Sequence, residues 1–154
     1  MKGGAILAAF AVLVLAGTAQ LGAQGVHVPG VAKPERARID YMLKCQGCHQ
    51  PDGSGNAVNT PPLAGAVASF LAVPGGREFL GRVPGVASVD LDDERTAEVL
   101  NWTLYRFDAG NVPAGFKPYT ASEIARLRAA PLRLDRAEAR ARLVAQMKDY
   151  SHVK

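Results

Sequence analysis

Two cysteines and one histidine fall within five consecutive residues, Cys45-Gln46-Gly47-Cys48-His49, and this segment constrains the chain more than any other. The chain has 154 residues and no cysteine outside this pair. A disulfide between cysteines three positions apart would close a very short loop, which restrains the unfolded chain little. The pair is therefore expected to carry out chemistry rather than to stabilise the fold.

The spacing matches the C-x-x-C-H segment that attaches haem covalently. Each thiol adds to one vinyl group of the haem, and a spacer of two residues lets one short loop reach both groups. The imidazole of the next residue then points at the iron. Cys45 and Cys48 are the predicted attachment points of one haem c, and His49 is the predicted iron ligand.

Two other uses of such a pair fit the surrounding sequence less well. A thioredoxin-like redox pair belongs at a strand-to-helix junction within a βαβ pattern, whereas a predicted helix precedes this pair. A zinc site needs four ligands, usually with a second ligand pair at matching spacing. The remaining histidines, His27 and His152, are isolated in the sequence.

The first 23 residues have the layout of a secretory signal peptide. A lysine follows the initiator methionine, residues 5–16 are an unbroken apolar run, and small residues favour cleavage near Ala19 or Ala23. A retained membrane anchor is the alternative, but a spanning helix needs about 20 apolar residues. We therefore expect an exported, periplasmic protein with no stable membrane span after cleavage.

One helix is predicted to lead directly into the cysteine pair. Pro34 suits the first position of a helix, and Ile39, Met42 and Leu43 share one face at helical spacing. The following residues 50–90 are punctuated by Gly and Pro and are predicted to be mostly loop. A large buried cofactor explains so long a loop, because loops can pack against it.

Three further helices are predicted after this loop. Asp92 begins the first, the capping box from Thr120 to Glu123 opens the second, and Asp135 begins the third, which runs to about Tyr150. The sequence thus predicts an all-α, loop-rich fold around one covalently bound haem. The predicted domains are a signal peptide (1–23), a flexible leader (24–33), a haem domain (34–107) and a basic helical C-terminal extension (108–154).

Basic residues concentrate near the C-terminus. Residues 117–154 hold nine basic and four acidic side chains, whereas residues 33–108 hold eight and ten. No basic patch alternates with aromatic residues, and no nucleic-acid-binding motif is present, so a nucleic acid partner is not expected. The basic segment suits an acidic protein partner or an anionic membrane surface, or it is simply a solvated helix face.

The region 34–107 resembles the class I cytochrome c family. The matching parts come in the order of that family: a helix leading into the C-x-x-C-H segment, then a loop containing Pro61-Pro62-Leu63-Ala64-Gly65, then a helix containing Val99-Leu100-Asn101-Trp102-Thr103-Leu104. The resemblance implies a cytochrome c-like fold. Residues 108–154 lie outside it.

The resemblance also implies roles for individual side chains and carbonyls. The carbonyl of Pro62 would accept a hydrogen bond from His49 and fix the orientation of the ring. Trp102 would pack against the first helix, at Tyr41 or Met42.

One part of the family pattern is missing. The family usually supplies a methionine to the iron from the loop before the last core helix, and here Val83 or Val86 stands in that place. No Met, His or Lys lies between Gln50 and Phe116. The sixth iron ligand is therefore left open. The candidates are Met147, Lys117, His152, His27, a residue of a partner protein, water or no ligand.

The predicted function is the transfer of single electrons from a periplasmic dehydrogenase to a downstream cytochrome or oxidase. No enzyme activity is expected, since no paired-carboxylate or Ser-His-Asp arrangement is present. Two alternatives stay open: a haem protein whose vacant distal site serves gas sensing or peroxide chemistry, and a haem subunit of a larger redox complex. Arg77 and Arg82 lie near the pocket in sequence and are candidates for pairing with haem propionates.

Overall fold

A computed structural model gives the fold and describes residues 27–151, without the side chains of residues 149–151. The predicted signal peptide lies outside the described residues. Within the described range the chain is helical, and its one β-type contact is an isolated antiparallel bridge between Asn56 and Thr60. The prediction of an all-α fold is confirmed. No described helix has the length and apolar character needed to cross a membrane.

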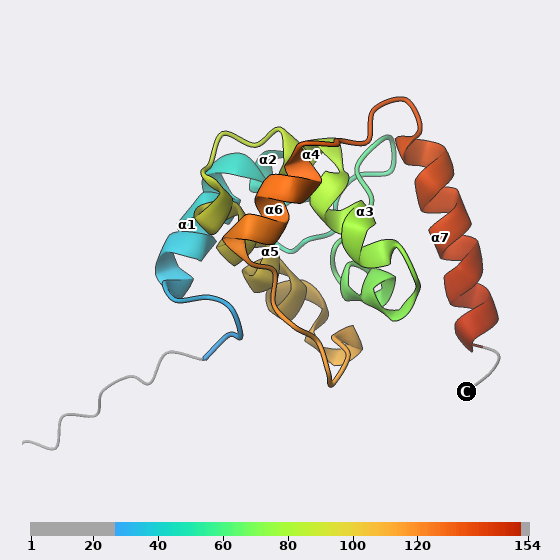
Figure 1. The fold of residues 1–154 in the computed structure, drawn as a ribbon, viewed down its shortest axis with the longest axis horizontal. Coiled ribbons are helices and arrows are strands. Elements are labelled where there is room, and N and C mark those ends of the chain that lie inside the picture. The colour runs from blue at the N-terminus through green and yellow to red at the C-terminus, as the bar shows by residue number, and fades with distance from the viewer. Residues whose placement is uncertain (1–26, 152–154) are drawn as a thin grey trace, which may run out of the picture.

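The helices follow the predicted order (Figure 1). Their bounds are α1 (Pro34–Lys44), α2 (Gln46–His49), η1 (Ala68–Ala72), α3 (Gly76–Arg82), α4 (Pro84–Ala87), α5 (Asp93–Asp108), η2 (Ala109–Asn111), α6 (Ala121–Arg128) and α7 (Arg136–Ser151). Helices α1 and α6 both pack on α5, whereas α7 lies along η1 and α3 at the far edge of the molecule (Figure 1).

Aromatic side chains join α1 to α5 next to the cysteine pair. Tyr41 is buried, and its ring centroid lies 5.4 Å from that of Trp102 and 5.0 Å from that of Phe107. The structure thus places Trp102 against Tyr41 of α1, one of the two contacts that the resemblance implied. An ion pair between the buried Asp40 and Arg95 adds a polar contact between the same helices.

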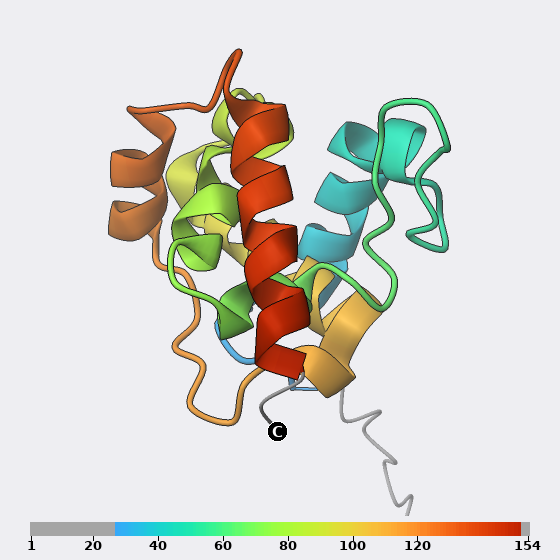
Figure 2. The same cartoon turned by 90° about the vertical axis from the view of Figure 1, so that its right-hand side faces the viewer.

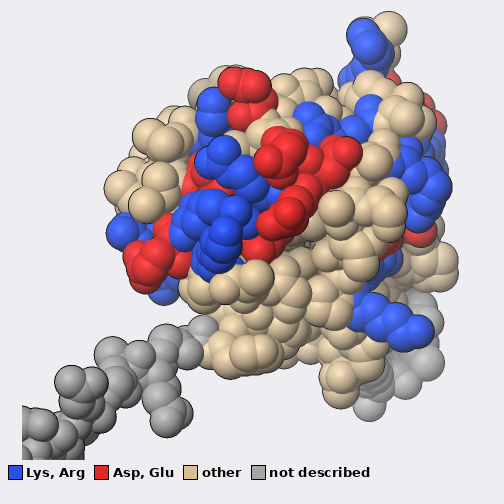
Figure 3. Space-filling view, turned by 60° about the vertical axis from the view of Figure 1, so that its left-hand side comes forward, with Lys and Arg blue, Asp and Glu red and all other residues tan. Residues whose placement is uncertain are grey.

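Charged side chains on the α1 side of the molecule are paired with one another. Arg36 of α1 contacts Glu98 at 2.9 Å and Glu94 at 3.1 Å, both on α5. Figure 3 shows this face, where basic and acidic side chains alternate closely. Hydrogen bonds to both glutamates raise the pKa of Arg36 further. Much of the charge on this face is thus balanced locally.

The segment after α5 folds back into the main core. Ile124 and Leu127 of α6 are buried. Leu127 lies so close to Gly81 of α3 that a Cβ atom at Gly81 would stand 2.4 Å from its Cδ1 atom. The hydroxyl of Thr120 accepts the amide of Glu123 at 3.3 Å and caps α6, as the capping-box pattern predicts.

One buried side chain, that of Asn101, fastens two distant segments of the described chain to α5. The side-chain nitrogen of Asn101 donates to the carbonyls of Gly30 at 3.1 Å and Tyr119 at 3.0 Å. Its side-chain oxygen accepts the amide of Tyr119 at 2.9 Å. Residues 28–32 of the predicted leader therefore lie against α5, and Val31 is buried there.

The two arginines considered for haem propionates bind the C-terminal segment instead. Arg77 forms hydrogen bonds to both carboxylate oxygens of Glu123, at 2.7 and 2.6 Å, and its guanidinium lies 4.2 Å from the ring centroid of Tyr119. Arg82 donates to the carbonyl of Ala130 at 2.6 Å. Both side chains thus hold the region around α6 against α3.

Helix α7 lies on the outside of the fold and packs on it through one face (Figure 2). Leu143 is buried, and Val144 and Met147 are partly buried against the main core. The remaining faces of α7 carry exposed charged residues, among them Arg136 and Arg142.

Residues 50–90 contain more helix than the sequence predicts. Helix α3 forms because Phe79 and Leu80 are buried there, and the ring of Phe79 stacks on Phe70 with centroids 5.1 Å apart. Gly76 permits this packing, since a Cβ atom there would lie 1.8 Å from the carbonyl oxygen of Phe70. Tertiary packing thus overrides the weak helical pattern.

Candidate functional site

The two cysteines and the histidine lie on a single helical turn. Helix α1 ends at Lys44 with Cys45 as its C-cap, and the amides of Cys48 and His49 both donate to the Cys45 carbonyl, at 3.2 and 3.0 Å. Both thiols are free; Cys45 is half-buried and Cys48 is exposed. Backbone geometry therefore brings the three predicted site residues together, with one thiol toward the interior and one toward solvent.

A buried tyrosine fixes the end of this turn. Gln50 has a φ of 66°, in the left-handed region, where the chain leaves the helical path. The hydroxyl of Tyr41 donates to the Gln50 carbonyl at 2.7 Å. Burial raises the pKa of Tyr41 to about 12, so the hydroxyl keeps its proton and remains a donor at neutral pH. No sequence pattern signals this role of the Tyr41 hydroxyl.

The imidazole of His49 is held in the neutral form that binds metals. Burial lowers its pKa, and the nearby carbonyl of Pro61 opposes this only in part. The Nδ1 atom is buried and makes no well-formed hydrogen bond, although the Pro61 carbonyl is close enough to influence the pKa of the ring. Pro61, rather than Pro62 as the resemblance implied, thus faces His49. This leaves Nε2 as the nitrogen to bind iron.

The thiol of Cys45 differs from a redox-active thiol. Burial, followed by the charge of Asp40, raises the pKa of Cys45 to about 11. Reactive cysteines in thiol–disulfide exchange have lowered pKa values, because the thiolate is the nucleophile. A helix also precedes the pair, where a thioredoxin-like site would have a strand. These observations favour covalent attachment of a cofactor over disulfide chemistry.

Apolar side chains from four parts of the chain surround Cys45. The cluster contains residues of α1, α5, the loop before α5 and the loop after the cysteine pair. Its members are Tyr41, Leu91 and Val99, with Cys45, Leu63, Val89, Trp102 and Phe107 packed against them. Such a lining excludes water from one side of the site and suits an apolar porphyrin.

The loop that follows the pair is folded back on itself by glycines. The amide of Gly55 donates to the carbonyl of His49 at 3.0 Å, and the carbonyl of Gly53 accepts the amide of Leu63 at 2.7 Å. Gly55 has a φ of +67°, and a Cβ atom there would lie 2.2 Å from the carbonyl oxygen of Thr60. This fold returns Pro61 to the side of His49.

The loop between α4 and α5 is held by one arginine of α6. Arg128 donates to the carbonyls of Ala87 at 3.1 Å, Val89 at 2.8 Å and Leu91 at 2.9 Å. It also contacts the carboxylate of Asp93 at 2.8 Å. We call residues 87–93 the distal loop, because they belong to the loop before α5, from which the family usually supplies a second iron ligand. Two of them, Val89 and Leu91, also pack in the cluster that contains Cys45. No sequence pattern signals this role of Arg128.

Comparisons with known proteins indicate the family of this chain. No family model matches the chain. A Thermus thermophilus protein named cytochrome c-552 is 37% identical over 121 residues, which cover 67% of this chain and 82% of that protein. A second Thermus thermophilus protein of the same name is 40% identical over 107 residues, covering 58% of this chain and 82% of that protein.

A helical fold with a Cys-x-x-Cys-His turn after its first helix defines the class of haem proteins in which the cofactor is bonded to the chain. The likeness to the two proteins named cytochrome c-552 extends over most of their length. The chain belongs to the c-type cytochrome family, and its cofactor is covalently bound haem c with its iron. The family assignment made from the sequence is confirmed.

Proposed function

We propose that Cys45 and Cys48 bind one haem through their sulfur atoms, that His49 binds the iron, and that the protein carries single electrons in the periplasm. The observation that carries this proposal is the helical turn with two free thiols and a neutral imidazole. When bound, the haem supplies an iron that changes between Fe(II) and Fe(III), one electron at a time.

The residues around the turn keep the site rigid. Tyr41 holds the backbone at Gln50, and the Pro61 carbonyl faces the His49 ring. A fixed ring orientation keeps the iron ligand in place in both oxidation states, and the apolar cluster limits the rearrangement of water. The exposed position of Cys48 leaves the cofactor edge nearest to it open to a partner protein.

The proposed partners are redox proteins of the periplasm: a dehydrogenase as electron donor and a cytochrome or oxidase as acceptor. The signal-peptide pattern of residues 1–23 supports export. Exposed basic residues of α7 support docking with an acidic partner, even though one of them, Arg142, contacts Glu138 on the same helix.

Covalent attachment is tested by expressing the chain with its signal peptide in a host that matures c-type cytochromes. Haem staining after denaturing electrophoresis should show a coloured band for the parent and for Gln46→Ala, a change in the spacer. The double variant Cys45→Ser/Cys48→Ser should lose the band. Colourless parent protein with both thiols free would reject the attachment site.

Electron transfer is tested by a redox titration of the purified holoprotein. We expect a reversible transition of one electron and rapid exchange of electrons with a second c-type cytochrome. An irreversible titration would contradict the carrier function while leaving covalent attachment intact.

A further inference from the structure

Haem iron accepts a second protein ligand from a small set of side chains, chiefly Met, His, Cys, Lys and Tyr. Neither Met, His nor Lys occurs between Gln50 and Phe116, so the loops around the site offer none of these donors. Any such ligand must come from the ends of the chain or from a tyrosine. His152, one of the candidates at the C-terminal end, lies outside the described residues.

The two methionines in the described range are engaged elsewhere. Met147 of α7 packs with the main core formed around η1 and α3, not with the apolar cluster around Cys45. Met42 lies on the outer face of α1 and is 46% exposed, with the sulfur 3.1 Å from the Nη1 atom of Arg38. Met42 therefore lies outside the site. Met147 packs in the same cluster as Val83 and Val86, so the spectrum of its variant is the decisive comparison.

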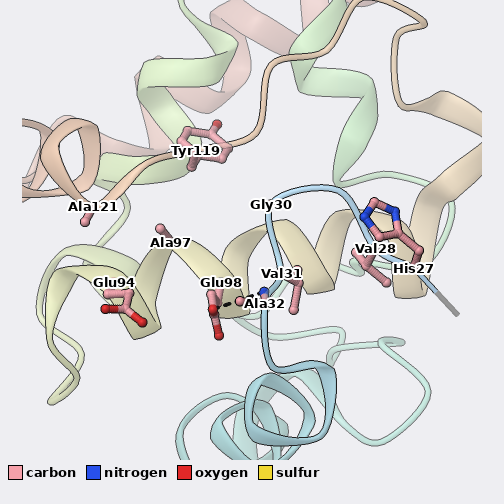
Figure 4. Close-up of a pocket in the computed structure, with 10 residues that line it drawn as sticks. All are labelled: His27, Val28, Gly30, Val31, Ala32, Glu94, Ala97, Glu98, Tyr119 and Ala121. Carbon is pink, nitrogen blue, oxygen red and sulfur yellow. Dashed lines mark hydrogen bonds between the residues drawn. The ribbon is translucent and has the colours of Figure 1, made fainter. Parts of the chain in front are cut away.

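His27 lies on another face of α5. It borders a shallow hollow of about 500 Å³ between residues 27–32, α5 and Tyr119–Ala121, together with Glu94 and Glu98 (Figure 4). No residue of the Cys45–His49 turn lines this hollow.

Three of the lysines and tyrosines near the site have partners for their polar side-chain atoms: Lys44, Tyr41 and Tyr119. Lys44 contacts Asp90 at 3.4 Å. The hydroxyls of Tyr41 and Tyr119 donate to backbone carbonyls, and the ring of Tyr105 contacts Phe116. Lys117 is exposed, and its carbonyl accepts an N–H of Arg77.

The distal loop has little freedom to bring a ligand closer. Arg128 binds three of its carbonyls and the carboxylate of Asp93. The amide of Leu132 donates to the carbonyl of Arg82 at 2.8 Å, which fastens the same C-terminal segment to the end of α3. The loop before α5 is therefore short, held at both ends and made of side chains that do not bind iron.

We propose that no side chain of the described residues binds the iron opposite His49, and that this position binds small exogenous molecules. The ligands expected are neutral diatomic molecules, with CO as the probe for Fe(II), and small anions, with cyanide as the probe for Fe(III). The inference rests on the proposed attachment of haem at Cys45 and Cys48, and it adds a ligand-binding site to the electron carrier.

The test uses the purified full-length holoprotein. Haem staining first establishes covalent attachment, and absorption spectra are then recorded for the ferric protein and for the dithionite-reduced protein with and without CO. We expect a high-spin ferric spectrum and complete conversion of the reduced Soret band at a slight molar excess of CO. Met147→Leu and Met42→Leu are the matched variants and should give the same spectra as the parent.

Each result decides between the two proposals. A parent with attached haem that is low-spin in both oxidation states and unchanged by CO would overturn the open position, but would leave the carrier function standing. If the parent protein is low-spin and one methionine variant is high-spin, that methionine is the iron ligand, and the proposal of an open position is overturned. A parent without attached haem would overturn the proposed function itself.

Discussion

The two sides of the site are held in different ways. One is the attachment side, the turn with Cys45, Cys48 and His49, and the other is the distal loop. On the attachment side the contacts are local. The hydroxyl of Tyr41 donates to the carbonyl of Gln50, and the amide of Gly55 donates to the carbonyl of His49. The distal loop depends on Arg128, which lies 35 to 41 residues further along the chain. The cofactor-binding turn is thus encoded locally, whereas the shape of the opposite side depends on the C-terminal segment.

The largest expected effect comes from breaking the attachment side at Gly55. Gly55→Ala introduces left-handed strain and a clash with the Thr60 carbonyl, for a loss of about 3 kcal/mol or more. Chemical denaturation of the holoprotein and its haem content measure this effect. We expect both stability and haem content to fall.

Two other glycines provide controls for this variant. Gly65 also has a positive φ, of +64°, but a Cβ atom there meets nothing within 4 Å, so Gly65→Ala should cost only about 1 kcal/mol. Gly85 has neither constraint and lies in helix α4, so Gly85→Ala should raise stability by about 0.4–1 kcal/mol. Equal losses at all three positions would show that the fold of the loop does not depend on Gly55.

Next in size is the change that releases the distal loop. Arg128→Gln removes the forked donor that binds three carbonyls and Asp93, and should lower the free energy of unfolding by about 2 kcal/mol. Haem content should stay the same, because the hydrogen bonds of this side chain all go to the distal loop. Arg126→Gln, at an exposed position of the same helix, is the control. Loss of haem in Arg128→Gln would abolish the distinction between the two sides.

A smaller effect is expected from the hydroxyl of Tyr41. Tyr41→Phe keeps the ring contacts with Trp102 and Phe107 but leaves the Gln50 carbonyl without its donor, at about 1 kcal/mol. Tyr105→Phe is the control, since that ring contacts Phe116. Thermal unfolding of the holoproteins measures the difference, and identical melting temperatures for both variants would show that the hydroxyl contributes nothing.

The smallest effect concerns acid stability on the attachment side. Hydrogen bonds from the hydroxyl and amide of Ser54 hold the pKa of Asp52 below its ordinary value. A depressed pKa in the folded state stabilises the fold above about pH 4, and this contribution is lost as the pH falls further. Asp52→Asn should therefore melt at a lower temperature than the parent at neutral pH, and the difference should shrink as the pH falls toward about 3. A difference independent of pH would exclude the charge as its source.

Local patterns predicted much of the molecule. Pro34 begins α1, Asp92 caps α5 and Thr120 caps α6, because each cap depends only on residues within one turn. Trp102 packs on Tyr41 as the resemblance implied. The site residues also come together, since Cys45 and His49 share a single turn.

Contacts between residues far apart in the chain could not be predicted from the sequence. Arg77 binds Glu123, 46 residues away, and Arg128 binds backbone carbonyls that carry no sequence signature. Helix α3 depends on the fit of Gly76 against Phe70, which no periodic pattern reveals. Every residue has a backbone carbonyl, so the sequence alone does not show which carbonyl faces His49. Only the three-dimensional structure distinguishes Pro61 from Pro62.

The position of Asn101 has a consequence for the order of events during synthesis. Its amide joins Gly30 to Tyr119, and these partners lie 71 and 18 residues away along the chain. The segment around Gly30 therefore waits for its anchor until Asn101, far later in the chain, has been synthesised. The N-terminal part of the haem domain is fastened late, after the cysteine turn has been made.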